Sequence, residues 1–283
     1  MFSFIWRLQE RTTRRLLDPW KNQSDSEKSR AVTVVTGASE GIGLTLSRAL
    51  ANCRHDLLLV ARNAENLQMA ADAIRSNSNV DVYIVSADLA TPEGCRTVSD
   101  ALQEKNLVCD FLINNAGIGL SGPFTNHSTE QLNELVNLNM RGLSDLTRRL
   151  LPGMLERRHG GILNIASLGG MAPGPYQAAY YASKAYVISL SEALAYEVRG
   201  SGVRISVAAP GPVGTKFHDK MNAENDHYIR FLGAMPAEKM VRSALFGFAI
   251  GQKVIVPGFI NFIFSIFVRF VPHFLMVPVI GWL

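Results

Sequence analysis

Short apolar runs rich in β-branched residues alternate with longer stretches of helical periodicity along most of the chain. The apolar runs predict seven strands, at 32–36, 56–61, 80–86, 110–114, 161–166, 203–208 and 253–256. The stretches between them predict helices at about 41–53, 64–76, 92–105, 129–158, 176–200 and 236–250. Near-continuous apolar strands that alternate with helices are typical of a parallel sheet covered on both faces. The pattern therefore predicts an α/β fold with a doubly wound, seven-stranded parallel sheet.

Three segments depart from this alternation. Residues 1–30 hold seven lysines and arginines against four acidic residues, a net charge of +3, together with several aromatic and leucine side chains. Residues 212–235 are interrupted by proline and glycine and are predicted to form a loop or lid. Residues 258–283 are almost wholly apolar. The chain is therefore divided into a basic amphipathic N-terminal arm (1–30), a main domain that includes the lid (31–257) and an apolar C-terminal segment (258–283).

The two end segments leave several interpretations open. The arm either packs on the domain or on a sister subunit, which we favour, or lies on an anionic membrane surface. In the C-terminal segment only eleven positions, 258–268, separate Pro257 from Arg269, whereas a membrane-spanning helix needs about 20 apolar residues. A full span is therefore disfavoured, and the segment covers a pocket, forms a subunit interface or rests on a membrane surface. Each interpretation favours an apolar substrate.

Charge and cysteine content narrow the class of protein. The 283-residue chain carries a net charge of +4, so the body beyond the arm is close to neutral and offers no basic stripe for nucleic acid. Cys53, Cys95 and Cys109 lie far apart and match neither a zinc site nor a disulfide framework. The N-terminus has no signal-peptide pattern. We expect a cytoplasmic protein without a metal site, with contact to a membrane surface as an alternative.

The first predicted strand runs into a glycine-rich turn that opens a helix. Gly37, Gly41 and Gly43 follow Thr36 with the spacing Gly-x-x-x-Gly-x-Gly. Without a Cβ atom, the backbone turns sharply and approaches a ligand closely. The start of a helix offers unpaired N–H groups and a positive dipole end to a pyrophosphate. A purely structural turn would also select glycine, but the position after the first buried strand favours nucleotide binding.

At this junction the sequence resembles the short-chain dehydrogenase/reductase (SDR) family, whose glycine motif is Thr-Gly-x-x-x-Gly-x-Gly. Further motifs of the family follow in order: Asn-Asn-Ala-Gly at 114–117, Asn139, Ser167, Tyr180-x-x-x-Lys184 and Pro210-Gly211. The resemblance implies a Rossmann-like, dinucleotide-binding catalytic domain over 31–257, with assembly into a homodimer or homotetramer. The residues that it implies for cofactor binding are Thr36, Gly37, Ser39, Glu40, Gly41, Ile42, Gly43, Arg62, Asp88, Leu89, Asn115, Ala116, Gly117, Tyr180, Lys184, Pro210, Gly211, Val213 and Thr215.

The end of the second predicted strand bears on the choice of nicotinamide cofactor. An acidic side chain there would bind a ribose 2′-hydroxyl and repel a 2′-phosphate. This chain has Ala61 followed by Arg62, and a guanidinium forms charge-assisted bonds to phosphate. Arg62 as a solvated surface charge is the alternative. We predict NADP(H) over NAD(H), and the resemblance implies that Asp88 contacts the adenine ring.

Tyr180 and Lys184 lie four residues apart on a predicted helix, so their side chains share one face. A neighbouring ammonium stabilises a phenolate, and the pKa of Tyr180 is therefore expected to fall towards working pH, as general acid–base catalysis requires. A Tyr-Lys pair of this spacing is also common on ordinary helices. The register of the family pattern selects Tyr180 over Tyr181, which we interpret as a packing residue. The resemblance further implies that Lys184 binds the nicotinamide ribose.

Two more residues complete the predicted catalytic set. Ser167 follows a predicted strand at its carboxyl end, where ligands bind in open α/β sheets. Its hydroxyl would orient a substrate carbonyl, although a turn serine beside two glycines would look the same. Asn139 lies inside a long predicted helix, where asparagine is unfavourable. The resemblance implies that it holds a water linked to the lysine, and Asn137 is a weaker rival.

These residues predict an NADP(H)-dependent oxidoreductase that interconverts a ketone or aldehyde with an alcohol. Its small-molecule substrate is expected to be apolar, either acyl or steroid-like. The main alternative is a catalytically silent NADP(H)-binding sensor or scaffold, although loss of the tyrosine, lysine or serine would be typical of that. An epimerase or dehydratase on the same fold is disfavoured, because 283 residues leave little room beyond the core.

Overall fold

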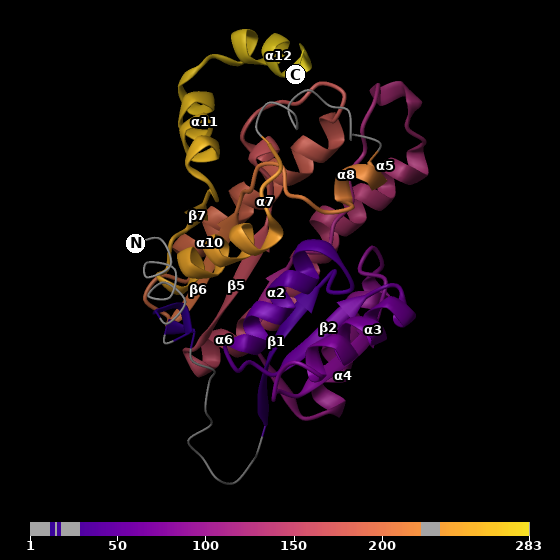
Figure 1. Cartoon of the computed structure of the whole chain (residues 1–283), viewed down its shortest axis with the longest axis vertical. Coiled ribbons are helices and arrows are strands. Elements are labelled where there is room, and N and C mark those ends of the chain that lie inside the picture. Colours follow the sequence, from indigo (N-terminus) through magenta and orange to yellow (C-terminus); the bar gives the residue numbers. More distant parts are fainter. Residues whose placement is uncertain (1–11, 15, 18–28, 222–232, 283) are drawn as a thin grey trace.

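The computed structural model describes residues 12–14, 16–17, 29–221 and 233–282, and a single seven-stranded sheet lies at its centre (Figure 1). The strands are β1 (Arg30–Thr36), β2 (Leu57–Ala61), β3 (Val82–Ser86), β4 (Leu107–Asn114), β5 (Gly160–Ile165), β6 (Val203–Ala208) and β7 (Val254–Ile255). Every neighbouring pair is parallel, in the order β3-β2-β1-β4-β5-β6-β7. The predicted fold class is confirmed.

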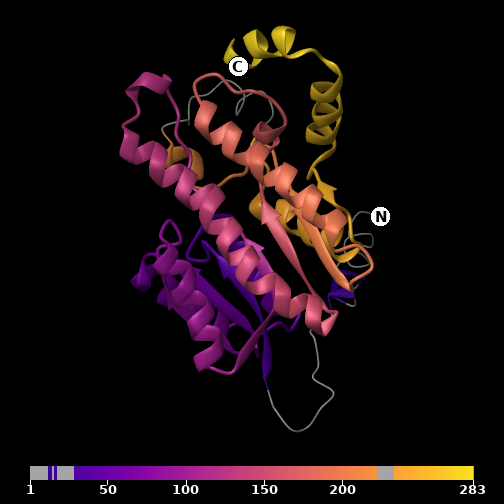
Figure 2. The ribbon, with the colours of Figure 1, turned by 180° about the vertical axis from the view of Figure 1, so that it is seen from behind.

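Helices cover both faces of the sheet. They are α2 (Gly41–Asn52), α3 (Ala64–Arg75), α4 (Pro92–Glu104), α5 (Thr129–Val136), α6 (Leu143–Arg157), α7 (Ala178–Glu197), α8 (Phe217–Lys220), α10 (Ala237–Ala249), α11 (Phe259–Phe270) and α12 (His273–Trp282). Helices α2, α3 and α10 pack on one face, and α4, α6 and α7 pack on the other, which Figure 2 brings to the front. All strands therefore end at one edge, where the intervening loops meet.

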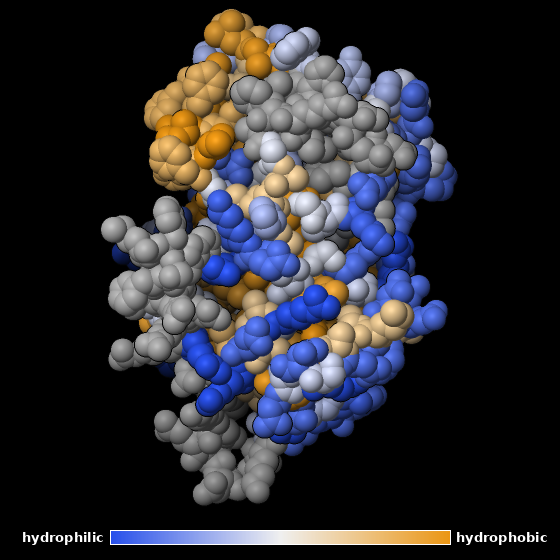
Figure 3. Space-filling view, viewed as in Figure 1, coloured by the Kyte–Doolittle hydropathy of each residue, from blue (hydrophilic) through white to orange (hydrophobic). Residues whose placement is uncertain are grey.

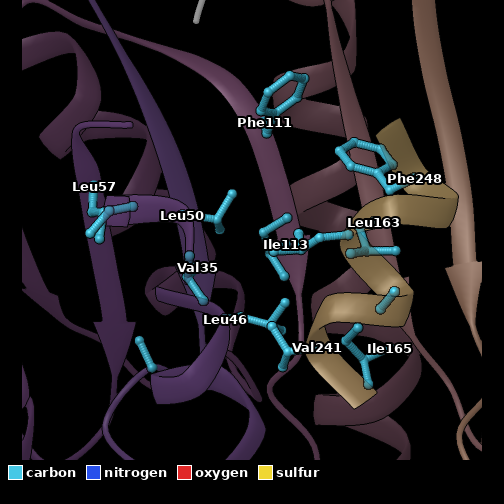
Figure 4. Close-up of a cluster of buried hydrophobic side chains, with 14 of the residues drawn as sticks. Val35, Leu46, Leu50, Leu57, Phe111, Ile113, Leu163, Ile165, Val241 and Phe248 are labelled. Atoms are coloured by element: carbon cyan, nitrogen blue, oxygen red, sulfur yellow. The ribbon is translucent and has the colours of Figure 1, made fainter. Parts of the chain in front are cut away.

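The core between the sheet and α2 and α10 is largely apolar (Figure 4), and the buried Ser47 and His55 beside it are hydrogen-bonded. Leu46 and Leu50 of α2 and Phe248 of α10 are fully buried against strand side chains. Phe248 meets Phe111 edge to face, with 5.4 Å between the ring centroids. Burial of each such side chain contributes about 1.5–3 kcal/mol, so this layer holds the glycine-rich start of α2 in place.

The long helix predicted at 129–158 is interrupted by a π-helical turn, Asn137–Gly142, between α5 and α6. Its last residue, Gly142, passes so close to the Leu89 carbonyl oxygen that an added Cβ would lie 2.2 Å away. The π-helical turn and the loop after β3 are therefore in backbone contact. The wider turn also rotates the residues within it relative to an uninterrupted α-helix. π-helical turns are often found at functional sites.

The described part of the N-terminal arm packs on the domain. Leu17 is fully buried in the core beside α2. Its carbonyl oxygen accepts a hydrogen bond of 2.6 Å from Nε2 of the buried His55. Packing on the domain, the favoured interpretation, thus holds for this portion, and the remainder of the arm lies outside the described residues.

The C-terminal segment forms two helices that the hydrophobic pattern did not define, α11 and α12. They stand beyond the carboxyl edge of the sheet, on the same side as the start of α7 (Figures 1 and 2). Within the part of the chain that the structure describes, neither these nor any other helix is long and apolar enough to cross a membrane.

Candidate active site

A cavity of about 850 Å³ opens at the carboxyl edge of the sheet. Most of the predicted site residues line it: Gly37, Ser39, Glu40, Gly41, Ile42, Arg62, Leu89, Asn115, Ala116, Gly117, Ser167, Tyr180, Lys184, Pro210, Gly211, Val213 and Thr215. Thr36, Gly43, Asp88 and Asn139 are not among the lining residues. These four lie behind the cavity wall, and their contacts indicate how they position it.

The glycine-rich turn needs glycine at each of its motif positions. Gly37 and Gly41 have φ angles of +64° and +56°, in the left-handed region. An added Cβ on Gly43 would lie 2.1 Å from the Gly37 carbonyl oxygen, because α2 begins directly against the turn. The N-cap residue Glu40 makes no side-chain hydrogen bond to the first amides of α2. The turn therefore fits a pyrophosphate, bound by backbone N–H groups and the helix dipole.

Thr36 and Asn115 fasten this turn to the neighbouring strand. The Thr36 hydroxyl oxygen accepts hydrogen bonds of 2.9 Å from the backbone amides of Asn115 and Ala116. The Asn115 side-chain amide donates to the Thr36 carbonyl oxygen at 2.9 Å. The ends of β1 and β4 are thus held at a fixed separation beneath the cavity floor, so Thr36 acts as a positioning residue.

Ser167, Tyr180 and Lys184 meet on the opposite wall. Tyr180 and Lys184 are buried on one face of α7, as their spacing predicts. Ser167 forms a side-chain hydrogen bond with Tyr180. The Lys184 ammonium donates to the Ile165 carbonyl oxygen at 3.0 Å and lies 5.7 Å from the centroid of the Tyr180 ring. The three side chains, one from the loop after β5 and two from α7, therefore lie close together.

The prediction that Lys184 lowers the pKa of Tyr180 is wrong for this structure. Burial raises the pKa of Tyr180 above its ordinary range, and the hydrogen bond from Ser167 offsets only part of that rise. Burial also lowers the pKa of Lys184 to about 8. Both shifts have the same cause, because removal from water disfavours a charged group. Tyr180 is therefore a neutral phenol at neutral pH, the form that donates a proton.

Asn139 occupies the π-helical turn and is buried. Its side-chain carbonyl accepts from the Ile118 amide at 2.9 Å, and its amide donates to the Ile118 carbonyl oxygen at 2.8 Å and to the Ser183 hydroxyl at 3.0 Å. An added Cβ on Gly117 would lie 3.1 Å from the Asn139 carbonyl oxygen and 3.5 Å from the Lys184 ammonium. Asn139 therefore holds the 117–118 backbone beside the lysine.

Arg62 follows β2, lines the cavity and is about half exposed, with its guanidinium 2.7 Å from a carboxylate oxygen of Glu134. Arg48, on α2, also lines the cavity and was not predicted from the sequence. Its signal was helical spacing, since Arg48 lies two turns after Gly41 and thus projects from the same face. The cavity lining therefore includes two arginines, Arg48 and Arg62, where the sequence predicted one.

Asp88, which the resemblance assigns to the adenine ring, lies in the loop after β3. Its carboxylate accepts a hydrogen bond of 3.0 Å from the Ala90 amide and so caps the turn that follows β3. Ala87 and Leu89, on either side of it, line the cavity. The segment after β3 therefore borders the cavity, and contact of Asp88 with the adenine ring stays a prediction.

The comparisons with known proteins agree with this geometry. The family described as short chain dehydrogenase matches residues 31–226, from β1 to beyond α8. The chain belongs to this family. The match contains the glycine turn, the π-helical turn and the catalytic wall, so all four predicted catalytic residues lie within it.

Individual SDR relatives are moderately similar. A ketoacyl reductase of Nostoc sp. is 36% identical over 180 residues, 64% of this chain and 62% of that protein. The human inactive hydroxysteroid dehydrogenase-like protein 1 is 33% identical over 210 residues, 73% of this chain and 62% of that protein. The chain thus spans 62% of the length of each relative. A solved SDR from Sphingobium yanoikuyae, in complex with NADPH, has 30% identity and a TM-score of 0.74, over 86% of this chain and 97% of that one.

The end of the cavity near Tyr180 is apolar in this SDR protein. Phe217 of α8, Phe264 of α11 and Ile280 of α12 line it. Tyr181, predicted to pack, does so against Gly174, where an added Cβ would lie 2.3 Å from its ring, but it also lines the cavity. Coverage of the pocket by the C-terminal segment was one of three open interpretations, and the two helices do contribute to the lining.

Asn139→Leu is expected to lower the free energy of unfolding by roughly 2–4 kcal/mol, because buried partners at Ile118 and Ser183 lose their hydrogen bonds. Urea unfolding measures the change. Asn137→Leu, in the same helical turn, is the matched control and is expected to cost less than about 1 kcal/mol. An equal decrease in the free energy of unfolding for the two variants would contradict the role assigned to Asn139.

Proposed function

We propose that this SDR protein is an NADP(H)-dependent oxidoreductase that interconverts a ketone or aldehyde with an alcohol. The observation that carries the proposal is that one cavity joins Ser167 and the buried Tyr180 and Lys184 with a glycine turn suited to pyrophosphate. The bound nicotinamide would supply or accept the hydride. An NADPH-oxidation screen over acetoacetyl thioesters, long-chain ketoacyl thioesters, steroid ketones and simple aldehydes tests the proposal.

The chain's own groups perform the proton chemistry. The hydroxyls of Ser167 and Tyr180 lie within hydrogen-bonding reach of each other and bind the carbonyl oxygen together. During reduction the neutral Tyr180 phenol donates its proton to that oxygen, and the resulting phenolate is reprotonated from solvent. During oxidation the phenolate form takes the proton of the alcohol. An ammonium has three donors, and Lys184 uses one on the Ile165 carbonyl. The other two are available to the ribose and to a water held near Asn139.

A preference for NADP(H) rests on charge at the adenosine end. Ala61 ends β2 without a carboxylate, and Arg62 and Arg48 both line the cavity. Two guanidiniums stabilise a 2′-phosphate by charge-assisted hydrogen bonds. The similar Sphingobium protein is described in complex with NADPH. These observations together support NADP(H) as the cofactor.

Arg62→Ala is expected to raise the Michaelis constant for NADPH about tenfold or more and to leave that for NADH nearly unchanged, because a charge-assisted bond to phosphate contributes roughly 1.5–3 kcal/mol. Steady-state kinetics with both cofactors measure the split. Glu134→Gln, which removes the partner of Arg62, is expected to lower the NADPH constant. An unchanged NADPH constant in Arg62→Ala would remove the case for NADP(H).

The substrate proposed is apolar, with an acyl or steroid-like body. Phe217, Phe264 and Ile280 surround the part of the cavity beside Tyr180, and apolar walls with few convergent polar groups favour ligands of that kind. The name of the Nostoc relative, a ketoacyl reductase, points to the same class. Assembly into a homodimer or homotetramer is part of the proposal and is tested by light scattering of the purified chain.

A second candidate function is a catalytically silent NADP(H)-binding protein. The human relative, which is named inactive, favours its consideration. This chain retains Tyr180, Lys184 and Ser167 together on one cavity wall, and it retains Asn139, which bonds to Ile118 and Ser183. These groups support catalysis instead. Tight NADPH binding with no turnover on any carbonyl in the screen would favour the silent alternative.

A further inference from the structure

Helix α11 has the reverse of the polarity that a water-facing helix shows. Its buried positions include two polar residues, Asn261 and Ser265, whose side chains bond to backbone carbonyl oxygens at 2.8 and 2.7 Å. Its exposed positions carry large apolar side chains, with Phe259 79% and Phe270 82% exposed. A surface helix normally turns its apolar stripe to the core and its polar face to water. The outer face of α11 is therefore built for a non-aqueous contact.

Helix α12 continues this apolar surface. We define the C-terminal apolar patch as the exposed side chains of both helices, namely Phe259, Ile260, Phe262, Ile263, Ile266, Phe267, Phe270, Phe274, Leu275, Val279 and Trp282. In Figure 3 the hydrophobic colour gathers at the end of the molecule that α11 and α12 form, whereas the described surface elsewhere in that view is mostly polar. Contiguous apolar patches of this kind mark sites of contact with a partner or a membrane.

Charge and shape select the occupant of the patch. Residues 239–283 contain four lysines and arginines and no aspartate or glutamate, and Arg269 is exposed at the end of α11. The two helices have 12 and 10 residues. A 12-residue helix is roughly 18 Å long, well short of the ~30 Å hydrocarbon core. Short apolar helices with cationic and tryptophan ends suit the interface of a membrane with anionic lipids.

The same helices connect the patch to the cavity. Phe264 of α11 and Ile280 of α12 line the cavity beside Tyr180, while their neighbours Phe262, Phe267 and Val279 are exposed on the outside. We propose that the C-terminal apolar patch rests in the interface of an anionic membrane and that the substrate enters the cavity from the lipid between α11, α12 and α7. The membrane contact is independent of the proposed function, whereas the route of entry depends on it.

Co-sedimentation with vesicles tests the contact. The full chain is expected to pellet with vesicles of phosphatidylcholine and phosphatidylglycerol, and the double variant Phe262→Asp/Phe267→Asp is expected to bind at least tenfold more weakly. Met69→Asp is the matched control, since Met69 is similarly exposed, at 65%, but lies on α3. Arg269→Glu is expected to weaken binding to anionic vesicles several-fold and to change binding to pure phosphatidylcholine little.

Three results would overturn the contact. The first is that the unaltered chain stays in the supernatant. The second is that the double variant binds as tightly as the unaltered chain, which would assign binding to another segment. The third is that the unaltered chain never binds vesicles but forms an oligomer, whereas the double variant is a monomer. The last outcome would assign the patch to a second copy. Thermal unfolding of each variant, expected within a few degrees of the unaltered chain, excludes misfolding as the cause of lost binding.

A kinetic comparison tests the entry route separately. With a long-chain ketone dissolved in anionic vesicles, the double variant is expected to lose at least tenfold in rate. With a small water-soluble carbonyl, its rate is expected to match that of the unaltered chain. Equal rates on the vesicle-borne ketone would reject entry from lipid. Absence of turnover on both substrates would count against the proposed function, while the vesicle-binding result would stand on its own.

Discussion

Tyr180→Phe is expected to lower kcat by about 10³-fold or more while NADPH still binds, because it removes the group assigned to proton transfer, and such a group contributes roughly 10²–10⁴-fold. The aromatic ring is retained, so its contact with Phe217, at 5.7 Å between the ring centroids, is preserved. The cavity keeps its shape and the glycine turn is untouched. Absorbance of NADPH measures turnover, and quenching of protein fluorescence measures cofactor binding.

Tyr181→Phe is the matched control for this experiment. Tyr181 lies next in the chain, and its ring centroid is 6.3 Å from that of Tyr180. We expect it to retain most of the activity, because its ring packs against Gly174 and its hydroxyl has no role in the proposed chemistry. Activity of Tyr180→Phe above a few per cent of the unaltered chain would end the assignment of Tyr180. A similar loss in both variants would point to packing instead.

The sheet was predictable because its strands are buried on both faces and are therefore nearly continuous apolar runs. Strands β2 and β6 lie within or at the predicted bounds, and the predicted strand at 253–256 contains β7, which is only two residues long. Only Val254 and Ile255 pair with β6, so the apolar run at 253–256 is longer than the paired segment. Turn chemistry fixed the starts of α4 and α5, where Thr91 and Ser128 accept hydrogen bonds from first-turn amides.

The π-helical turn could not be read from the sequence. It depends on the approach of Gly142 to the Leu89 carbonyl, a contact between segments over fifty residues apart. The directions of the pKa shifts of Tyr180 and Lys184 could not be predicted for the same reason. Spacing places Lys184 beside Tyr180, but burial decides which ionic forms are favoured, and burial is a property of the assembled cavity.

The two C-terminal helices show a different limit. Along α11 the polar residues Asn261, Ser265 and Arg269 recur every four positions, which was a usable sign of a helix. The surrounding residues are almost all apolar, so hydrophobic periodicity gives no direction for the buried face. In the structure Asn261 and Ser265 face inward and Arg269 is exposed. The side chains of Asn261 and Ser265 bond to backbone carbonyl oxygens three or four residues earlier, so these two polar groups are satisfied locally and can face inward.

Lys184→Met is expected to lower kcat by at least 10²-fold and, in the cofactor-free protein, to raise the free energy of unfolding at pH 7. Lys184 is buried without a carboxylate among the causes of its shift, and burial lowers its pKa to about 8 from the ordinary 10.5. That difference corresponds to an upper limit of roughly 3 kcal/mol against folding with the lysine charged. Loss of the hydrogen bond to Ile165 offsets part of it, so a net gain of ~1–2 kcal/mol is expected.

The pH dependence of the free energy of unfolding is a second, independent test of whether Lys184 destabilises the fold. Below pH 8 Lys184 is protonated in both the folded and the unfolded chain, and the penalty is fully present. As the pH rises above 8, the folded chain releases the proton first, so the penalty declines and the contribution of Lys184 to stability improves. Urea unfolding between pH 7 and 9.5 should therefore show a rise in the unaltered chain relative to Lys184→Met. Lys253→Met, at an exposed position, is the control, and parallel pH profiles for all three proteins would mean that Lys184 is not held in a desolvated site.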